Sequence, residues 1–208
     1  MRRQKGRLRQ GDNDAGYGVR ESHLGKHIGM TQTTHLSCIC GQTRLAVEGT
    51  PILAAECCCT SCRTAGGRLE ALPGAPKIVE PNGSTQLILY RKDRVHFDKG
   101  AELLREHRLT PQSATRRVVA ICCNTPIFLE FTKGHWLSLY GYLWSPETRP
   151  RIEMRTMTSD ALPGVNLSND IPNPKRHTFS FFVKLLSAWP AMGFSVPKIT
   201  FVKGEIDD

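Results

Sequence analysis

The chain has 208 residues with 28 Lys and Arg, 19 Asp and Glu, and a formal net charge of +9. This length accommodates one domain with tails and a core that needs no covalent cross-links, which excludes a small disulfide-stapled scaffold. No apolar run is long enough to span a bilayer, and the N-terminus lacks the apolar segment of a secretory signal. We therefore expect a cytoplasmic protein with reduced thiols and no membrane partner.

The first 32 residues are predicted to form a basic disordered arm. They are rich in Arg, Gly, Gln and Asp, show no periodicity, and carry much of the positive charge of the chain. Two interpretations are open: a nucleic-acid-binding arm that contacts phosphates, or an extension upstream of Met30 with no role.

Residues 33–145 are predicted to form one mainly β domain. Residues 35–47 read as two strands joined by a tight turn at Cys38-Ile39-Cys40-Gly41, where glycine permits the positive φ of a metal-binding turn. Arg68 to Leu72 reads as a short helical turn. Further strands are expected at 86–90, 95–97, 102–109, 118–121, 127–131 and 136–143. Short strands at this spacing favour an antiparallel architecture.

Residues 146–208 are predicted to form a Pro-rich connector followed by a C-terminal helical extension. Repeated prolines indicate an irregular path from 145 to 176, and apolar residues at helical spacing predict a helix from Phe179 to Trp189. We expect the apolar face of this helix to pack on the sheet, in preference to a membrane surface or a protein partner.

The cysteines are the candidate metal ligands. All eight fall in three groups: Cys38 and Cys40; Cys57, Cys58, Cys59 and Cys62; and Cys122 and Cys123. In a reducing compartment, such groups indicate metal rather than disulfides. Three thiols of the central group, Cys57, Cys59 and Cys62, can converge on one zinc ion and leave a coordination position open, as in catalytic sites. The four outer thiols could hold a second ion.

Other polar residues near the cysteines are weaker candidates. Cys58 is expected to be a buried bystander, and Glu56 is either an acid or base beside the metal or a solvated carboxylate. Arg116 and Arg117 face either solvent or an anionic substrate. The histidines considered as ligands are each expected to be structural; they are His35, His96, His107 and His135.

The cysteine pattern resembles a known family. Its elements are Cys38-x-Cys40-Gly41, then Cys57-x-Cys59-x-x-Cys62-Arg63, then a late thiol group before Thr125, and finally Gly141-Tyr142-Leu143. Between about Ser37 and Trp144 the chain is similar to the glutathione-dependent formaldehyde-activating family, which includes centromere protein V-like proteins. The resemblance implies an Mss4-like zinc-binding antiparallel β fold, a structural zinc on the first and last thiol groups, and a catalytic-type zinc on the central three.

The late thiol group departs from the pattern of that family. Alignment of Cys123-Asn124-Thr125 with the family's Cys-Gly-Thr places Ala120 where another cysteine is usual, and Cys122 is then the substitute. Three outcomes are open for this site: Cys38, Cys40, Cys122 and Cys123 together, three thiols with water, or no metal.

The function implied by the resemblance is carbon–sulfur lyase chemistry. We expect a zinc-dependent enzyme, with one or two zinc ions, that acts on a thiol adduct such as S-hydroxymethylglutathione, with glutathione as co-substrate. Three thiolates leave a zinc site negatively charged, so Arg63 or neighbouring amides are expected to offset that charge. The alternative is a non-catalytic zinc-binding module that contacts nucleic acid, through the basic arm, or protein.

Overall fold

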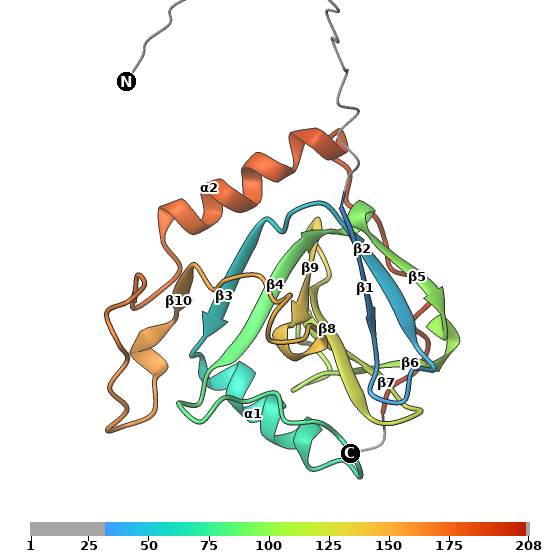
Figure 1. The fold of residues 1–208 in the computed structure, drawn as a ribbon, viewed down its shortest axis with the longest axis horizontal. Helices are drawn as coiled ribbons and strands as arrows, with labels where there is room; N and C mark the ends of the chain where they lie inside the picture. The colour runs from blue at the N-terminus through green and yellow to red at the C-terminus, as the bar shows by residue number, and fades with distance from the viewer. Residues whose placement is uncertain (1–31, 207–208) are drawn as a thin grey trace, which may run out of the picture. The chain divides into compact units, whose positions relative to one another are not determined.

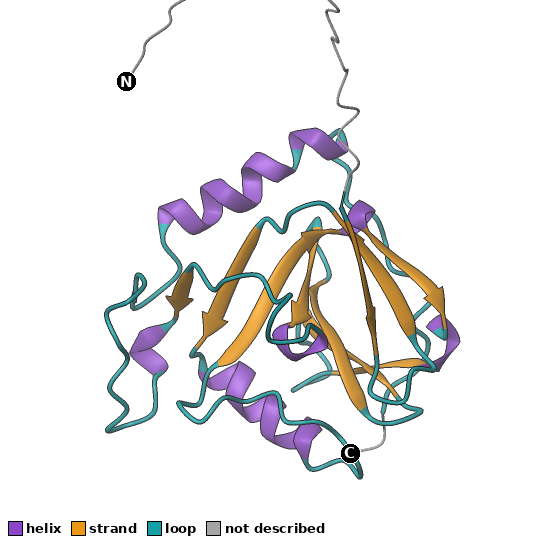
Figure 2. Cartoon of the chain, in the orientation of Figure 1, coloured by secondary structure: helices purple, strands orange, loops and turns teal. Residues whose placement is uncertain are grey.

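The computed structural model describes residues 32–206, so nearly all of the predicted basic arm lies outside the described residues. In that part of the chain the mainly β class with a C-terminal helix is confirmed (Figures 1 and 2). The strands are β1 (Thr33–Ser37), β2 (Arg44–Glu48), β3 (Leu53–Cys57), β4 (Thr85–Arg91), β5 (Val95–Lys99), β6 (Leu104–His107), β7 (Thr115–Ala120), β8 (Thr125–Phe131), β9 (Trp136–Tyr140) and β10 (Met154–Thr156). The α-helices are α1 (Thr60–Glu70) and α2 (Phe179–Ala188). The 3₁₀ turns are η1 (Lys92–Arg94), η2 (Ala101–Leu103), η3 (Gly141–Leu143), η4 (Thr158–Asp160) and η5 (Pro190–Met192).

The described strands form two sheets. The smaller has the order β1-β2-β5, and the larger has the order β10-β3-β4-β9-β8-β7-β6. Neighbours are antiparallel, except that β10 runs parallel to β3, with Arg155 opposite Glu56. The larger sheet therefore ends in a strand that comes from the last third of the chain.

The two faces of the larger sheet have different partners. Because side chains alternate along a strand, Ile88 and Leu139 point to one face while Leu87 and Leu89 point to the other. The first face packs with Leu45 and other residues of the smaller sheet in one core. The second face belongs to a separate cluster that also contains side chains from α1 and α2. This second face is the one that carries the candidate site.

Several predicted elements differ in the structure. The expected strand over 102–109 is shorter, since η2 precedes β6, and the last residues of 136–143 form η3. β3 was not predicted because all five of its residues are buried, so its sequence shows no alternation. The helical turn at 68–72 is the end of a longer helix that begins at Thr60. The connector over 145–176 was wrongly predicted to be irregular throughout, since it contains β10.

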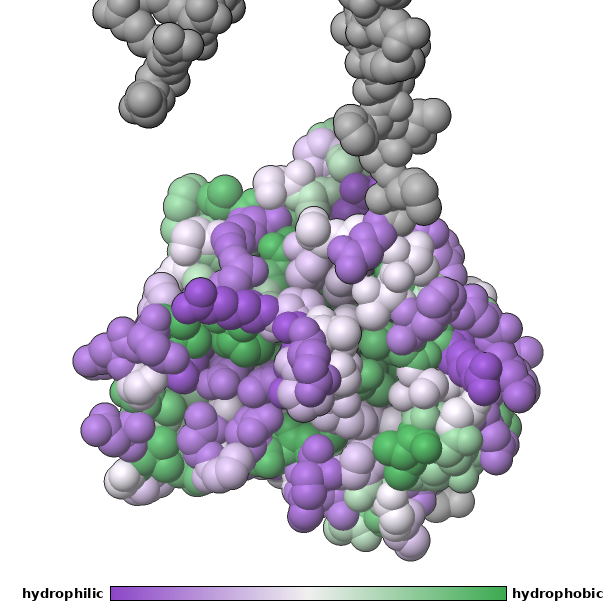
Figure 3. Space-filling model, viewed as in Figure 1, coloured by the Kyte–Doolittle hydropathy of each residue, from purple (hydrophilic) through white to green (hydrophobic). Residues whose placement is uncertain are grey.

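Helix α2 covers part of the larger sheet. The hydroxyl of Thr178 accepts a hydrogen bond from the Phe181 amide at 3.2 Å and caps its first turn. Leu185 is buried, but Phe179 and Leu186 are exposed, and hydrophobic residues gather over α2 in Figure 3. The prediction that the apolar face packs on the sheet therefore holds for one side of the helix. No helix in residues 32–206 is both long and apolar enough to cross a membrane.

Candidate metal centres

The first and last cysteine groups meet in what we call the four-thiol cluster, which consists of Cys38, Cys40, Cys122 and Cys123. The sulfur of Cys122 lies 3.7 Å from that of Cys38, 3.4 Å from that of Cys40 and 3.8 Å from that of Cys123. Zinc–sulfur bonds of about 2.3 Å in a tetrahedron place sulfurs about 3.8 Å apart, so these spacings fit a zinc ion. The cluster joins the β1–β2 turn of the smaller sheet to the β7–β8 turn of the larger one.

Turn geometry brings these thiols together. Gly41 has φ +72° and donates its amide to the Cys38 carbonyl, while the Thr43 amide donates to the Cys38 sulfur at 3.3 Å. In the other turn, Asn124 has φ +52°, a conformation that asparagine tolerates better than most residues. Asn124 thus supplies the left-handed residue of the turn between Cys123 and Thr125.

Ala120, where the sequence comparison expected a cysteine, does not keep Cys122 and Cys123 away from the first thiol group. Ala120 is fully buried at the end of β7, and the adjacent Cys122 and Cys123 both lie within reach of the other two sulfurs. Although burial raises the pKa of Cys38, hydrogen bonds from the Thr43 amide and neighbouring thiols lower it to about 7. A lowered pKa favours the thiolate that a metal requires.

The central group forms the three-thiol cluster, which consists of Cys57, Cys59 and Cys62. Their sulfurs lie within 4.8 Å of one another. Cys57 ends β3, Cys59 is the N-cap of α1, and Cys62 lies in its first turn, with its amide donating to the Cys59 sulfur at 3.3 Å. Cys58 points away from the cluster and is 1% exposed, which confirms the prediction of a buried bystander.

The electrostatics of this cluster favour one thiolate at Cys59. Hydrogen bonds from Cys57 and then Cys62 lower the pKa of Cys59, and the positive charge of Arg117 lowers it further. The same hydrogen bond with Cys59 raises the pKa of Cys57 to about 11. A helix N-terminus adds to the preference for negative charge.

Arg117 has a part in the site that the sequence left open. Arg117 is 2% exposed and lies on the face of the larger sheet that the three-thiol cluster borders. Its Nη2 donates a hydrogen bond to the Ser61 carbonyl at 3.3 Å. Its Nε has no hydrogen-bond partner among the described residues. Burial rules out the solvent alternative for Arg117, whereas its place in the pocket wall is compatible with the anionic-substrate alternative.

The neighbouring Arg116 is on the opposite face of β7 and serves the fold. Its Nε lies 2.7 Å from Glu130, and its Nη1 lies 2.7 Å from Glu106. Lys92 pairs with the other Glu130 oxygen at 2.5 Å. These acids pair with Arg116, which is buried and does not line the pocket, so it faces neither solvent nor a substrate there, the two alternatives predicted for it.

Arg63 was expected to offset the thiolate charge, and the structure gives it other partners. Its Nη1 donates to the carbonyls of Cys58 and Asp160 at 3.2 and 3.1 Å. The Asp160 carboxylate in turn accepts from the Thr60 amide at 3.3 Å. Arg63 therefore ties the start of α1 to the segment after β10, and Arg117 is the cation on the cluster's side.

Glu56 is neither a solvated carboxylate nor an acid or base beside the metal, the two roles predicted for it. Glu56 is buried and lies between Ala55 and Cys57 in β3, but its side chain is on the opposite face of the sheet from theirs. There, Arg155 Nε lies 2.9 Å from the Oε2 of Glu56. Gln86 also donates to Glu56 at 3.5 Å. The ion pair between Glu56 and Arg155 links β3 to β10, which is a structural role. Glu56 is therefore not an acid or base beside the thiols.

None of the four predicted histidines belongs to either thiol cluster. His35 and His96 lie beside acidic residues, with His35 3.6 Å from Asp98 and His96 3.5 Å from Glu48. His107 is buried in β6, and His135 is hydrogen bonded to the Leu185 carbonyl at 2.8 Å. Their expected structural roles agree with these contacts.

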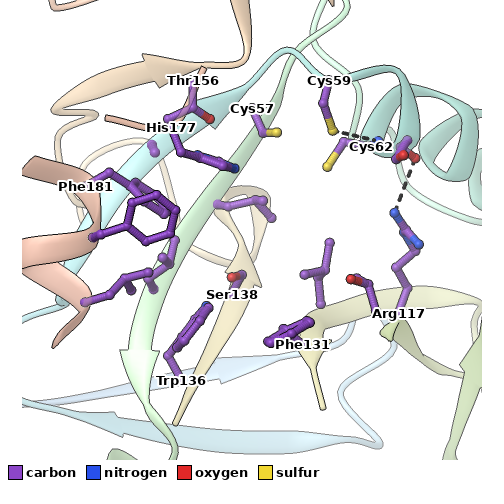
Figure 4. Close-up of a pocket in the computed structure, with 18 residues that line it drawn as sticks. Cys57, Cys59, Cys62, Arg117, Phe131, Trp136, Ser138, Thr156, His177 and Phe181 are labelled. Atoms are coloured by element: carbon purple, nitrogen blue, oxygen red, sulfur yellow. Dashed lines mark hydrogen bonds between the residues drawn. The ribbon is translucent and has the colours of Figure 1, made fainter. Parts of the chain in front are cut away.

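A pocket of about 430 Å³ opens beside the three-thiol cluster. The sheet supplies one wall, with Trp136 and Ser138 from β9, and α2 supplies the facing wall with Phe181 (Figure 4). His177 also lines the pocket and stacks on Phe181 with ring centroids 4.4 Å apart; burial lowers its pKa. Sequence reasoning missed His177, because nothing in the local pattern joins it to cysteines that lie more than a hundred positions earlier in the chain.

The donor sets in both clusters consist of sulfur alone, which suits zinc. The four-thiol cluster offers a full tetrahedral set. The three-thiol cluster lacks a fourth protein ligand among the described residues and borders the pocket. The two clusters therefore fit a closed and an open zinc site.

Comparison with known proteins finds distant structural similarity. No family model and no curated protein matches the chain. Among solved structures, the chain is similar to a protein from Rhodobacter sphaeroides with 15% identity, a TM-score of 0.41, and coverage of 59% of this chain and 100% of that one. A likeness at this level names no family, so the function has to be inferred from the site.

Proposed function

We propose that the protein is a zinc-dependent carbon–sulfur lyase-like enzyme that acts on a thiol adduct. The observation that carries the proposal is the three-thiol cluster at the wall of a pocket of about 430 Å³, a size typical of small-molecule sites. The cysteine pattern that resembles the glutathione-dependent formaldehyde-activating family supports the choice of reaction. In this proposal residues 33–145 hold both zinc ions, and residues 146–208 complete the pocket.

The reaction would cleave a hemithioacetal, R–S–CH₂OH, to a thiol and formaldehyde. The carbon–sulfur bond breaks with its electron pair passing to sulfur, the hydroxyl oxygen forms the carbonyl, and the hydroxyl proton ends on the sulfur. No oxidant or reductant is needed. Zinc at the three-thiol cluster would supply an electrophile that stabilises a thiolate or polarises an oxygen.

The residues of the chain would contribute in distinct ways. Cys57, Cys59 and Cys62 would hold the metal, and Arg117 would offset their negative charge from its buried position. His177 lines the same pocket and could accept the hydroxyl proton. The four-thiol cluster would hold its zinc as a link between the sheets.

The proposal is tested by exchange kinetics on the zinc-loaded full chain. Formaldehyde is mixed with glutathione or with 2-phenylethanethiol, and NMR exchange spectroscopy measures how fast each S-hydroxymethyl adduct forms and breaks. We expect acceleration of at least one adduct, loss of that acceleration in Cys59→Ser, and its retention in Cys58→Ser. No acceleration of either adduct by a protein with two zinc ions would overturn the proposal and favour the non-catalytic module.

A further inference from the structure

The pocket beside the three-thiol cluster is walled mainly by apolar and aromatic side chains. Alternate residues of five neighbouring strands point into it, because they share one face of the larger sheet. The apolar sheet residues that line it, apart from the thiols, are Ala55, Leu87, Leu89, Leu129, Phe131 and Trp136. From α2, Phe181, Phe182 and Leu185 close the opposite side.

The pocket offers little to a charged ligand. Among its described lining residues Arg117 is the only Lys or Arg, and there is no Asp or Glu. Arg117 is itself buried and donates from Nη2 to the Ser61 carbonyl at 3.3 Å. A ligand that brought further charges into this space would leave them without partners, which is unfavourable.

Glutathione is such a ligand. At neutral pH it carries two carboxylates and an ammonium group around a peptide backbone. An ammonium group requires an acidic or carbonyl partner, and two carboxylates require more than the one guanidinium that the wall provides. The polar lining side chains that remain, such as Ser138, Thr156 and His177, match one or two small oxygen or sulfur atoms.

We propose that the pocket selects a neutral thiol adduct with an aromatic or aliphatic body, and that it discriminates against glutathione. The sulfur would point to the three-thiol cluster and the body would lie between the sheet and Phe181 of α2, as the arrangement in Figure 4 allows. The placement of the sulfur rests on the proposed function, whereas the preference for an apolar body rests on the wall alone.

Binding of three probe thiols to the zinc-loaded full chain tests this inference. The probes are 2-phenylethanethiol, 2-mercaptoethanol and glutathione, measured by isothermal titration calorimetry with zinc content checked after each titration. Burial of a phenyl group predicts that 2-phenylethanethiol binds at least about tenfold more tightly than either other thiol. Glutathione binding as tightly as 2-phenylethanethiol would overturn the inference.

Substitutions on α2 supply matched controls. Phe181→Ala removes a pocket side chain, and Phe179→Ala removes an 85% exposed phenyl group from the same helix. We expect Phe181→Ala to weaken the binding of 2-phenylethanethiol about fivefold or more and to leave the affinity for 2-mercaptoethanol unchanged. Phe179→Ala should change neither affinity. Phe182→Ala is the second pocket variant should Phe181→Ala fail to fold, as judged by circular dichroism. If the pocket variant lost affinity for 2-phenylethanethiol and for 2-mercaptoethanol equally, the apolar wall would not be what binds the phenyl group.

The two proposals fail in different ways. Preferential binding of 2-phenylethanethiol without accelerated adduct exchange would remove the lyase reaction and keep the apolar pocket. Accelerated exchange of the glutathione adduct, together with glutathione binding as tight as that of 2-phenylethanethiol, would keep the reaction and remove the apolar selectivity.

Discussion

The two thiol clusters use the same side chain in different surroundings. The four-thiol cluster lies between turns of two sheets, its sulfurs lie within 4.8 Å of one another, and none of its residues lines the pocket. The three-thiol cluster lies at a strand end and a helix start, with a buried arginine and an apolar pocket beside it. The comparison teaches that the number of thiols and the neighbouring space, rather than residue type, distinguish the two clusters.

The largest effect is expected from Cys38→Ser in the four-thiol cluster. Loss of this buried ligand should remove one zinc equivalent and the link between the sheets, and lower the melting temperature by more than about 10 °C. Metal analysis and thermal unfolding measure both quantities. Cys58→Ser is the control, since Cys58 is equally buried but outside both clusters. An unchanged melting temperature in Cys38→Ser would refute the structural role.

Cys59→Ser in the three-thiol cluster should separate metal content from stability. We expect loss of one zinc equivalent and of adduct exchange, with a melting temperature within about 4 °C of the parent, because this site borders a pocket instead of joining the sheets. The same two measurements apply. A collapse in stability as large as that of Cys38→Ser would show that the clusters do not differ as described.

Arg117→Met sharpens the account of charge at the three-thiol cluster. Loss of the cation should weaken zinc binding there about tenfold, in the range typical of outer partners of metal sites. A competition titration with a chromophoric chelator measures the affinity. Arg117→Lys keeps the charge and should recover part of the loss. Equal affinity in Arg117→Met and the parent would mean that the thiolates need no such partner.

Glu106→Gln should affect the stability of the fold and spare both thiol clusters. Burial raises the pKa of Glu106, but Arg108 and Arg116 outweigh it and hold the pKa below its ordinary value. The stabilisation is therefore present above the unfolded pKa of about 4.3 and is lost as pH falls through the lower folded pKa. Urea unfolding from pH 7 to pH 3 should show a weaker acid dependence in Glu106→Gln, with a loss of about 1–2 kcal/mol at pH 7.

Glu102→Gln is the matched control for this variant, because Glu102 is exposed. Its unfolding curve should follow the parent at every pH. Zinc affinity at the three-thiol cluster should be unchanged in both variants, since Arg116 and Arg117 lie on opposite faces of β7. Weakened zinc binding in Glu106→Gln would show that the two arginines are coupled.

The thiol groups could be predicted from the sequence because short spacings such as Cys57-x-Cys59-x-x-Cys62 set ligand geometry locally. The sequence offered the four outer thiols as a second ligand set among other outcomes, and the structure does bring Cys122 and Cys123 to Cys38. The sequence could not predict whether Arg116 or Arg117 faces the site. Strand alternation places the two side chains on opposite faces of the sheet, but it does not say which face borders the three-thiol cluster.

The pocket was beyond the sequence for a similar reason. Its two walls come from strands β3, β4, β7, β8 and β9 and from α2, and only the packing of distant segments brings them together. His177 follows no motif, and β10 has three residues, too few for a periodic signal. The helix itself was correctly predicted over nearly its full length, since its apolar spacing is a local property.

The parallel pairing of β10 with β3 has a consequence for how the protein is made. Arg155 and Glu56, which pair across these strands, are 99 positions apart, and α2 follows later still. On the ribosome, where segments emerge in order, the three cysteines are available well before β10 and α2 exist to enclose them. A metal ion held by these thiols would therefore have access to them before translation of the last segments completes the pocket.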